Sequence, residues 1–364
     1  ATRATRSTLA EPDLCNKAMM NPTSNRMSAG SDDRAGLQAL ARDIVSRERE
    51  RDSLFGEVGD LGRLLERLSG VTQDVHAPLD ANETVTAAGL AISPVKAALC
   101  AREPLRTIVF IRGLAAAIEQ ARRPDRPVRV LYAGCGPLAT LALPLMTLFD
   151  PEQASFTLVD IHAASLGSAR GLVSRLGLEA HVAGYMLADA CSLRLDPAAL
   201  PDVIVSETMN AALRSEPQVA IMRHLAMQAP QALLVPESVT VEACLLRLGR
   251  ELSPPLDDGG APQPPRRERV ELGPVFRLDA AAIRAWSGLD AALPAGVVRV
   301  PPTVPAGMQP RLLTKIVSFG SHRLQDWESS LNMPQHFPGR PALQGGETLQ
   351  FAYRIGEQPG LVLL

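Results

Sequence analysis

The spacing of hydrophobic residues predicts helices in the first third of the chain. Three stretches have apolar side chains about every 3.6 residues, the period of an α-helix: 34–69, 94–100 and 105–121. They predict a helical region over 33–125, with a mostly polar linker at 72–84. Residues 1–32 mix Ser, Thr, Asn and Arg without any period, and we expect this segment to be disordered.

Strand-like and helix-like patterns then alternate over residues 126–237. Short apolar runs predict buried strands in VRVLYAG, FTLVDI, AHVAGYMLADA, DVIVSET and ALLVPES. The stretches between them with helical spacing are 138–148, 165–176 and 217–229. Such alternation is typical of right-handed βαβ units, so we predict an α/β fold with a parallel sheet.

Beyond Pro236 the pattern changes to the alternation of half-buried strands. The runs are TVEACLLRL, RVELGPVFRL, GVVRVPP, LLTKIVSFG, LQFAYRIG and GLVLL, separated by turns rich in Pro and Gly. They predict a β-rich domain over 238–364, built as an antiparallel sheet or barrel. The composition of 253–267, SPPLDDGGAPQPPRR, predicts a mobile loop. A chain of 364 residues is also long enough to form more than one domain.

Composition and charge argue against several classes of function. A net charge of −2 and a pI of about 6.4 give no field that would attract nucleic acid or an anionic membrane surface. No apolar run reaches the roughly 20 residues that a membrane helix needs. The five cysteines contain no Cys-x-x-Cys pair, and the six histidines form no cluster with metal-ligand spacing. We therefore expect a cytoplasmic protein with reduced thiols, no metal site and a small-molecule substrate.

The first strand of the predicted parallel sheet ends in a turn with Gly134, Cys135 and Gly136. Glycine lets the backbone approach a ligand, and the helix that follows offers free N–H groups to an anionic group. The same turn could be only a tight connection between strand and helix. Ala139 replaces the third glycine of Gly-x-Gly-x-x-Gly, and no phosphate-binding Lys follows. We therefore favour a nucleoside without a phosphate chain, S-adenosylmethionine, over a dinucleotide.

Carboxylates close the next two strands. Asp160, followed by Ile161, stands where a carboxylate can accept hydrogen bonds from both ribose hydroxyls. Asp189, followed by Ala190, is placed to accept a hydrogen bond from an exocyclic amine. One acid at a strand end is often a helix cap, but two in succession after this turn predict a nucleoside site at the carboxyl edge of the sheet.

Three further motifs complete the pattern. The loop SETMNAALRSE contains Glu207, Met209 and Glu216, the segment LRTIVF contains Arg106, and LLVPES leads into the β-rich part. They resemble the double-glutamate loop, the Arg-Thr-x-x-Tyr helix and the strand before the barrel in protein arginine methyltransferases. These enzymes are a group of the class I S-adenosylmethionine-dependent methyltransferases.

The resemblance implies a Rossmann-like methyltransferase core over 126–237 that binds S-adenosylmethionine, and a substrate and dimerisation domain over 238–364. The implied cofactor contacts are Arg106, Gly134, Cys135, Gly136, Asp160, Ile161, Asp189, Ala190 and Glu207. Glu207 and Glu216 would be the catalytic carboxylates that clamp a cationic acceptor, although Glu216 could instead only cap the next helix. The resemblance also implies a homodimer.

The sequence departs from that family at four motif positions: Tyr132, Leu138, Thr208 and Asn210. The family's Thr-His-Trp loop has no clear counterpart, so Trp327 or His336 is the candidate to close a substrate pocket, beside Met209. For Trp327 and His336, a core or surface role is equally compatible with the sequence.

These departures concern the methyl acceptor more than the cofactor. We expect a small amino-acid-like or guanidino substrate in specialised metabolism, such as natural product biosynthesis. The alternatives are methylation of a thioether, amine or carbon of another small metabolite, methylation of protein arginine, and a catalytically silent scaffold that binds the cofactor.

Overall fold

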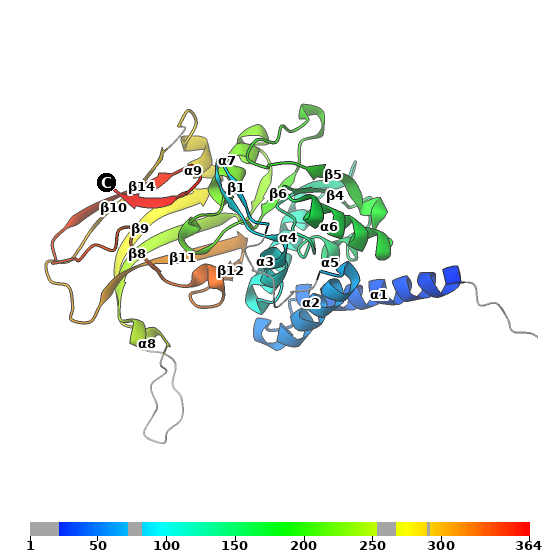
Figure 1. Ribbon diagram of the computed structural model, residues 1–364, viewed down its shortest axis with the longest axis horizontal. Coiled ribbons are helices and arrows are strands. Elements are labelled where there is room, and N and C mark those ends of the chain that lie inside the picture. The colour runs from blue at the N-terminus through cyan, green and yellow to red at the C-terminus, as the bar shows by residue number, and fades with distance from the viewer. Residues whose placement is uncertain (1–21, 72–81, 253–266, 290–291) are drawn as a thin grey trace, which may run out of the picture.

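The structure, a computed structural model, describes residues 22–71, 82–252, 267–289 and 292–364. Helices of the N-terminal region pack beside a parallel sheet, and antiparallel strands form a β-rich part toward the C-terminus (Figure 1). This is the fold class that the sequence predicts. Within the described residues, no helix is long and apolar enough to cross a membrane.

The N-terminal region consists of helices and one short hairpin. Its elements are α1 (Pro22–Val45), η1 (Arg51–Leu54), α2 (Phe55–Ser69), β1 (Thr84–Thr86), β2 (Gly89–Ala91), α3 (Pro94–Cys100) and α4 (Pro104–Ala121). Helix α1 begins inside the segment 1–32 that we expected to be disordered, and residues 1–21 lie outside the described part. The apolar faces of α1 and α2, including Leu37, Ile44 and Leu61, are buried in the core.

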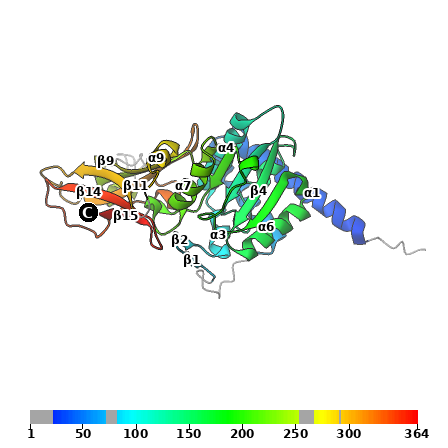
Figure 2. The same ribbon diagram turned by 90° about the horizontal axis from the view of Figure 1, so that it is seen from above.

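The hairpin β1–β2 follows the expected linker at 72–84 and overlaps it only at Thr84, while 72–81 lies outside the described residues. Each of its strands has three residues, which is too short for an alternating pattern to be recognised. Figures 1 and 2 place the hairpin between the parallel sheet and the β-rich part.

The parallel sheet has the strand order β5-β4-β3-β6-β7, and all neighbouring strands run parallel. Its elements are β3 (Val128–Ala133), α5 (Leu143–Met146), β4 (Ala154–Asp160), α6 (Ala163–Arg175), η2 (Glu179–His181), β5 (Val182–Leu187), η3 (Pro197–Ala199), β6 (Val203–Ser206), η4 (Ala211–Leu213), α7 (Gln218–Gln228) and β7 (Leu233–Val235). Strands β3 and β6 are buried almost throughout, as expected when helices cover both faces of a sheet.

The helix predicted over 138–148 is shorter than expected. Ala139 has a φ of 41°, a left-handed conformation that an α-helix cannot include. The chain therefore turns through 137–142, and the regular helix α5 begins at Leu143, directly before Pro144. Proline is well tolerated there because the first helical N–H groups have no partner within the helix.

The β-rich part contains two antiparallel sheets within the described residues, with the orders β12-β11-β8-β9 and β10-β14-β15. Strand β13 pairs with β11 beside the first of them. The elements are β8 (Ser238–Leu246), α8 (Leu248–Leu252), β9 (Arg269–Asp279), α9 (Ala280–Ala285), β10 (Ala292–Arg299), β11 (Gln309–Phe319), β12 (His322–Leu324), η5 (Ser330–Asn332), β13 (Gln335–His336), β14 (Thr348–Arg354) and β15 (Gly360–Leu363). The loop predicted at 253–267 lies outside the described residues except for Arg267.

Helix α4 joins the two parts of the molecule. It lies against β7 of the parallel sheet and against β11 and β12 of the antiparallel sheet. A Cβ added at Gly113 of this helix would collide with the side chain of Ser318 on β11. The main hydrophobic core accordingly includes residues of α4, of the parallel sheet and of β11.

Candidate active site

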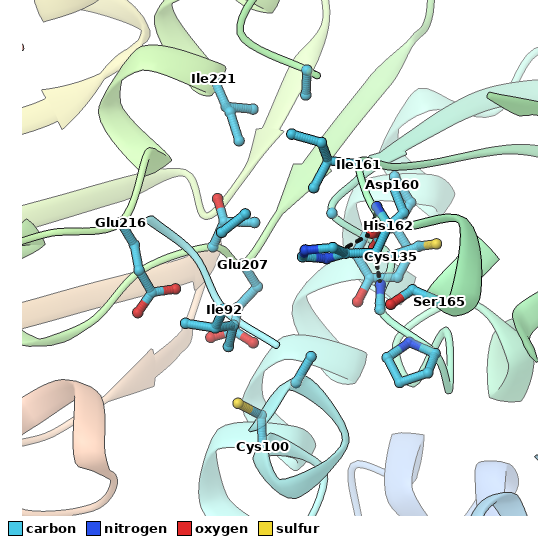
Figure 3. A pocket seen from close by; sticks show the side chains of 18 of the residues that line it. Ile92, Cys100, Cys135, Asp160, Ile161, His162, Ser165, Glu207, Glu216 and Ile221 are labelled. Atoms are coloured by element: carbon cyan, nitrogen blue, oxygen red, sulfur yellow. Dashed lines mark hydrogen bonds and ion pairs between the residues drawn. The ribbon is translucent and has the colours of Figure 1, made fainter. Parts of the chain in front are cut away.

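A cavity of about 1040 Å³, including its open mouth, lies at the carboxyl ends of β3, β4, β5 and β6 (Figure 3). The strand order reverses between β3 and β6, and open parallel sheets bind ligands beyond the strand ends at such a point. Residues of α3, α4 and the hairpin also line it. The sequence-predicted residues that line it are Arg106, Gly134, Cys135, Gly136, Asp160, Ile161, Asp189, Ala190, Glu207 and Glu216.

The turn after β3 requires its first glycine. Gly134 and Gly136 have φ values of 72° and 65°, in the left-handed region. A Cβ added at Gly134 would collide with Cγ2 of Thr208, whereas one at Gly136 would lie 3.6 Å from Cβ of Ala97. The glycine turn is therefore packed tightly against the loop that follows β6, and it leaves room only toward α3.

Asp160 is held by the backbone around it. Its Oδ2 accepts a hydrogen bond from the N–H of Gly136 (2.9 Å), and its Oδ1 accepts one from the N–H of His162 (2.8 Å). Burial raises the pKa of this carboxyl group, and the two hydrogen bonds oppose the rise. Because a carboxylate has about four acceptor positions, positions remain for a ligand in the cavity. The capping role and the ligand-binding role expected from the sequence are thus compatible.

Asp189 has a similar arrangement after β5. Its Oδ1 accepts a hydrogen bond from the N–H of Cys191 (2.8 Å), which closes a tight turn. The apolar side chains of Ile161 and Ala190 line the cavity with it. An apolar wall with a carboxylate at its edge is suited to a flat ring that carries an amine.

Arg106, at the start of α4, is buried between the carboxylate of Glu103, directly before the same helix, and that of Glu207, directly after β6. Its Nη1 donates to Oε1 of Glu103 (2.9 Å), and its Nη2 forms an ion pair with Oε1 of Glu207. Its Nε has no hydrogen-bond partner although it is buried. Glu103 also accepts hydrogen bonds from the N–H and the hydroxyl of Ser330 (both 2.7 Å), so the β-rich part helps to position this group.

Glu216 shares the cavity but forms no ion pair with a described residue. Figure 3 shows its carboxylate and that of Glu207 in the same part of the cavity, near Cys100. Burial raises the pKa of Glu216 to about 7; the positive charge of Arg106 lowers it and the negative charge of Glu207 raises it. One buried guanidinium therefore faces the carboxylates of Glu103, Glu207 and Glu216.

The same environment shifts the pKa values of the neighbouring groups Glu207, Arg106 and Cys100. Burial raises the pKa of Glu207, and Arg106 opposes that shift. Burial lowers the pKa of Arg106, but the charges of Glu207 and Glu103 raise it more, so the guanidinium stays charged. Burial raises the pKa of the Cys100 thiol to about 11, which keeps this side chain neutral at pH 7. The cavity thus combines an apolar wall with an excess of carboxylates.

The loop between the two glutamates has an unusual backbone. Ala212, Leu213 and Ser215 have φ values of 60°, 53° and 62°, and such left-handed conformations cost about 1–3 kcal/mol each for residues other than glycine. The β-rich part holds them in place. The hydroxyl of Thr314 accepts a hydrogen bond from the N–H of Ala212 (2.7 Å), and the hydroxyl of Tyr353 donates to the carbonyl of Leu213 (2.8 Å).

Sequence reasoning did not identify the groups that support the loop. Gln218 is fully buried and accepts hydrogen bonds from the N–H and hydroxyl of Thr208 (2.9 and 3.0 Å), while its amide donates to the carbonyl of Ser206 (2.9 Å). Nothing in the local sequence distinguishes Gln218 or Thr314 from surface residues of a helix or strand. The available signal for Glu103 was its position three residues before Arg106, the spacing of helix neighbours.

The hairpin β1–β2 covers the loop from the outside. The N–H of Leu90 donates to the carbonyl of Ser215 (2.7 Å), and Gly89 leaves no space there for a side chain. Glu83, just before β1, forms an ion pair with Lys96 of α3 (2.7 Å). The hairpin and α3 are thereby linked on the side of the cavity opposite the sheet.

The substrate residues predicted from the sequence do not meet at the cavity. Met209 is buried in the core, and Trp327 donates from Nε1 to Oε2 of Glu251 (2.9 Å). His336 is exposed on β13. None of the three is among the described residues that line the cavity.

The chain resembles a solved structure described as the Trypanosoma brucei PRMT1 enzyme–prozyme heterotetrameric complex with AdoHcy. The sequence identity is 14%, the TM-score is 0.41, and the match covers 70% of this chain and 86% of that chain. No protein-family model and no curated protein matches the sequence.

Proposed function

We propose that the protein is an S-adenosylmethionine-dependent methyltransferase whose acceptor is a small molecule with a cationic, amino-acid-like or guanidino group. The observation that carries this proposal is the charge arrangement at the cavity. Arg106 is ion-paired with Glu207, while Glu216, on the same loop, forms no ion pair with a described residue. A cation bound between the glutamates would balance the buried negative charge.

The residues around the cavity fit the cofactor. The orphaned Nε of Arg106 is a donor suited to a carboxylate, and Asp160 keeps acceptor positions for ribose hydroxyls. Asp189 beside Ala190 suits the amine of adenine. The glycine turn after β3 leaves backbone exposed where a nucleoside must approach closely. When bound, S-adenosylmethionine supplies an electrophilic methyl group.

The remaining chemistry belongs to this chain's own groups. Glu207, oriented by Arg106, and Glu216 would hold the N–H groups of the acceptor and point one nitrogen into the cavity. Glu216, with a pKa of about 7, is suited to take the proton that the acceptor nitrogen loses on methylation. The apolar side chains of Leu90 and Ile92 would help to exclude water.

Calorimetric titration with S-adenosylmethionine and S-adenosylhomocysteine tests the cofactor assignment. We expect binding to the wild-type chain and at least about tenfold weaker binding to Asp160→Asn, because loss of a charged acceptor costs about 1.5–3 kcal/mol. Glu152→Gln, an exposed acid away from the cavity, is the matched control and should bind like the wild type. Unchanged affinity in Asp160→Asn, or no binding at all, would refute the assignment.

Isotope-labelled cofactor with a panel of acceptors tests the substrate class. We expect label in free arginine or a related guanidino or amino compound, and loss of transfer in Glu207→Gln and Glu216→Gln. Transfer only to neutral thioethers would reject a cationic acceptor. Transfer only to arginine-rich peptides would assign a protein substrate, and turnover with any acceptor excludes the silent scaffold.

The homodimer also stays a proposal. The apolar faces of α1 and α2, which could have formed a dimer contact, are buried on this chain's own core at Leu37, Ile44 and Leu65. A homodimer would therefore need another surface for its contact. Sedimentation equilibrium over a range of concentrations would show whether the chain self-associates.

A further inference from the structure

Three arginines and one histidine that do not line the cavity come from the β-rich part and from the glutamate loop. Arg311 of β11 pairs across the strands with His336 of β13, so their side chains lie on the same face. Arg340 follows in the turn after β13, and Arg214 comes from the glutamate loop. All three arginines act electrostatically on His336. We call Arg214, Arg311, Arg340 and His336 the arginine cluster.

No carboxylate of the described residues forms an ion pair with any of the three arginines. Arg311 is only 7% exposed, yet its guanidinium donates to neutral atoms, the carbonyl of Pro310 (2.9 Å) and Oε1 of Gln309 (2.5 Å). Arg269, on the same antiparallel sheet, provides the contrast. It is similarly buried, but Glu251 and Asp326 both pair with it.

This arrangement costs free energy that a bound anion would offset. A buried charge is unfavourable unless a counter-charge is close, and like charges in contact add to the cost. Burial lowers the pKa of Arg311, and Arg340 lowers it further. Arg340 has a φ of 49°, a conformation that costs energy for a residue other than glycine. The positive charge of Arg340 nevertheless acts on Arg311.

We propose that the arginine cluster binds an oxyanion, a phosphate or carboxylate group of a small molecule, at a site separate from the cavity. Guanidinium groups bind such oxygens in a planar, bidentate manner, and several of them around one anion are typical of phosphate and carboxylate sites. Because Arg214 belongs to the glutamate loop, a bound anion would also tie that loop to β11 and β13. Anion binding by the arginine cluster does not depend on whether the protein transfers methyl groups.

His336 is an internal probe for the anion. Burial and then the charges of Arg311, Arg340 and Arg214 lower the pKa of His336. An anion bound among these groups raises it, because negative charge favours the protonated imidazole. His322 is a reference, since burial and the charges of Arg112 and Arg47 lower its pKa in the same way elsewhere. Screening by salt raises the pKa of both histidines, whereas an anion bound at the arginine cluster raises only that of His336.

The experiment is a pH titration of the histidine ring protons by NMR at constant ionic strength, with the signals assigned through His336→Asn and His322→Asn. Inorganic phosphate and succinate are compared with chloride. We expect phosphate, succinate or both to raise the pKa of His336 saturably and to leave that of His322 at its chloride value. The two arms distinguish a phosphate from a carboxylate ligand. Equal shifts of both histidines, or no shift beyond that in chloride, would overturn the proposal.

Variants at the exposed arginines complete the test. The double variant Arg214→Gln with Arg340→Gln should have a higher pKa of His336 without phosphate and should weaken phosphate binding at least about tenfold. Arg299→Gln, at an exposed arginine of β10 outside the cluster, is the matched control and should bind phosphate normally. If the double variant binds phosphate as the wild type does, the site is not the arginine cluster. Arg311→Lys, which keeps the buried charge, should lose affinity while remaining folded.

Discussion

The guanidinium of Arg106 forms an ion pair with the carboxylate of Glu207, and both groups are buried. Arg106 stands at the start of α4 and Glu207 directly after β6, so the contact joins the helical region to the parallel sheet. This pair sets the charge of the cavity, because it neutralises one glutamate of the loop and leaves the other without a partner.

Removal of Arg106 should destabilise the protein strongly. In Arg106→Met, Glu207 becomes a buried charge without a counter-ion, and breaking a buried pair in this way costs about 3–5 kcal/mol. Urea denaturation at pH 8 would measure the loss, which should shrink as the pH is lowered, because burial raises the pKa of Glu207 and protonation removes its charge. Arg102→Met is the control, since Arg102 pairs with Glu66 at 52% exposure and its loss should cost no more than about 1 kcal/mol. Equal losses in the two variants would contradict the expectation.

Glu216 should make the folding stability depend on pH. Its pKa is about 7 in the folded chain against 4.5 without burial, so the folded state binds more protons between these values. The contribution of Glu216 to stability is therefore complete below pH 4.5 and is lost as the pH rises to about 7. At 1.36 kcal/mol per pKa unit, the loss is about 3 kcal/mol.

The difference between wild type and Glu216→Gln isolates this effect from all other titrating groups. The variant should become more stable than the wild type as the pH rises from 5 to 8, measured by urea denaturation at each pH. Glu152→Gln, at an exposed site, should follow the wild-type curve. Parallel curves for wild type and Glu216→Gln would show that Glu216 does not have a raised pKa.

Gly134→Ala should cost more than the conformational strain alone. The left-handed conformation of an alanine at this position destabilises the protein by about 1–3 kcal/mol. In addition, the new Cβ collides with Cγ2 of Thr208. The second substitution Thr208→Ser removes that methyl group but keeps the hydroxyl. The double variant should therefore regain the stability lost through the collision and keep only the loss from backbone strain. Gly177→Ala, with a φ of 63° and only an ordinary contact of the added Cβ with Nη1 of Arg34 at 3.8 Å, should show the strain alone. Additive losses in the double-mutant cycle would show that the contact is absent.

Thr314→Val on β11 should make the glutamate loop less stable. The substitution is nearly isosteric but removes the acceptor for the N–H of Ala212, and a buried donor left without a partner costs about 1–3 kcal/mol. Hydrogen exchange of amides in 207–216 should become faster. Thr157→Val on β4, where the hydroxyl has no hydrogen bond among the described residues, should leave exchange in this loop unchanged. Unchanged exchange in Thr314→Val would mean that the loop holds its shape without β11.

The sequence by itself determined the architecture and the cavity edge of the sheet. The period of apolar residues predicted most helices and strands, because burial of one face is a local property of each element. Strand ends can also be located in the sequence, and all parallel strands end at the same edge. Gly134, Asp160, Asp189 and Glu207 therefore had to come together once the sheet formed.

Only the tertiary structure decided how the glutamate loop is held and which side chains share its charge. The hydrogen bonds of Thr314, Tyr353 and Gln218 to this loop join residues far apart in the chain, and no local pattern encodes such contacts. The placement of His336 away from the cavity followed from the pairing of β13 with β11, where register depends on partners distant in sequence, and Trp327 is held by its hydrogen bond to Glu251. The tertiary structure also gave the two glutamates of this loop different electrostatic environments. Glu207 forms an ion pair with Arg106, whereas Glu216 is buried without an ion pair among the described residues.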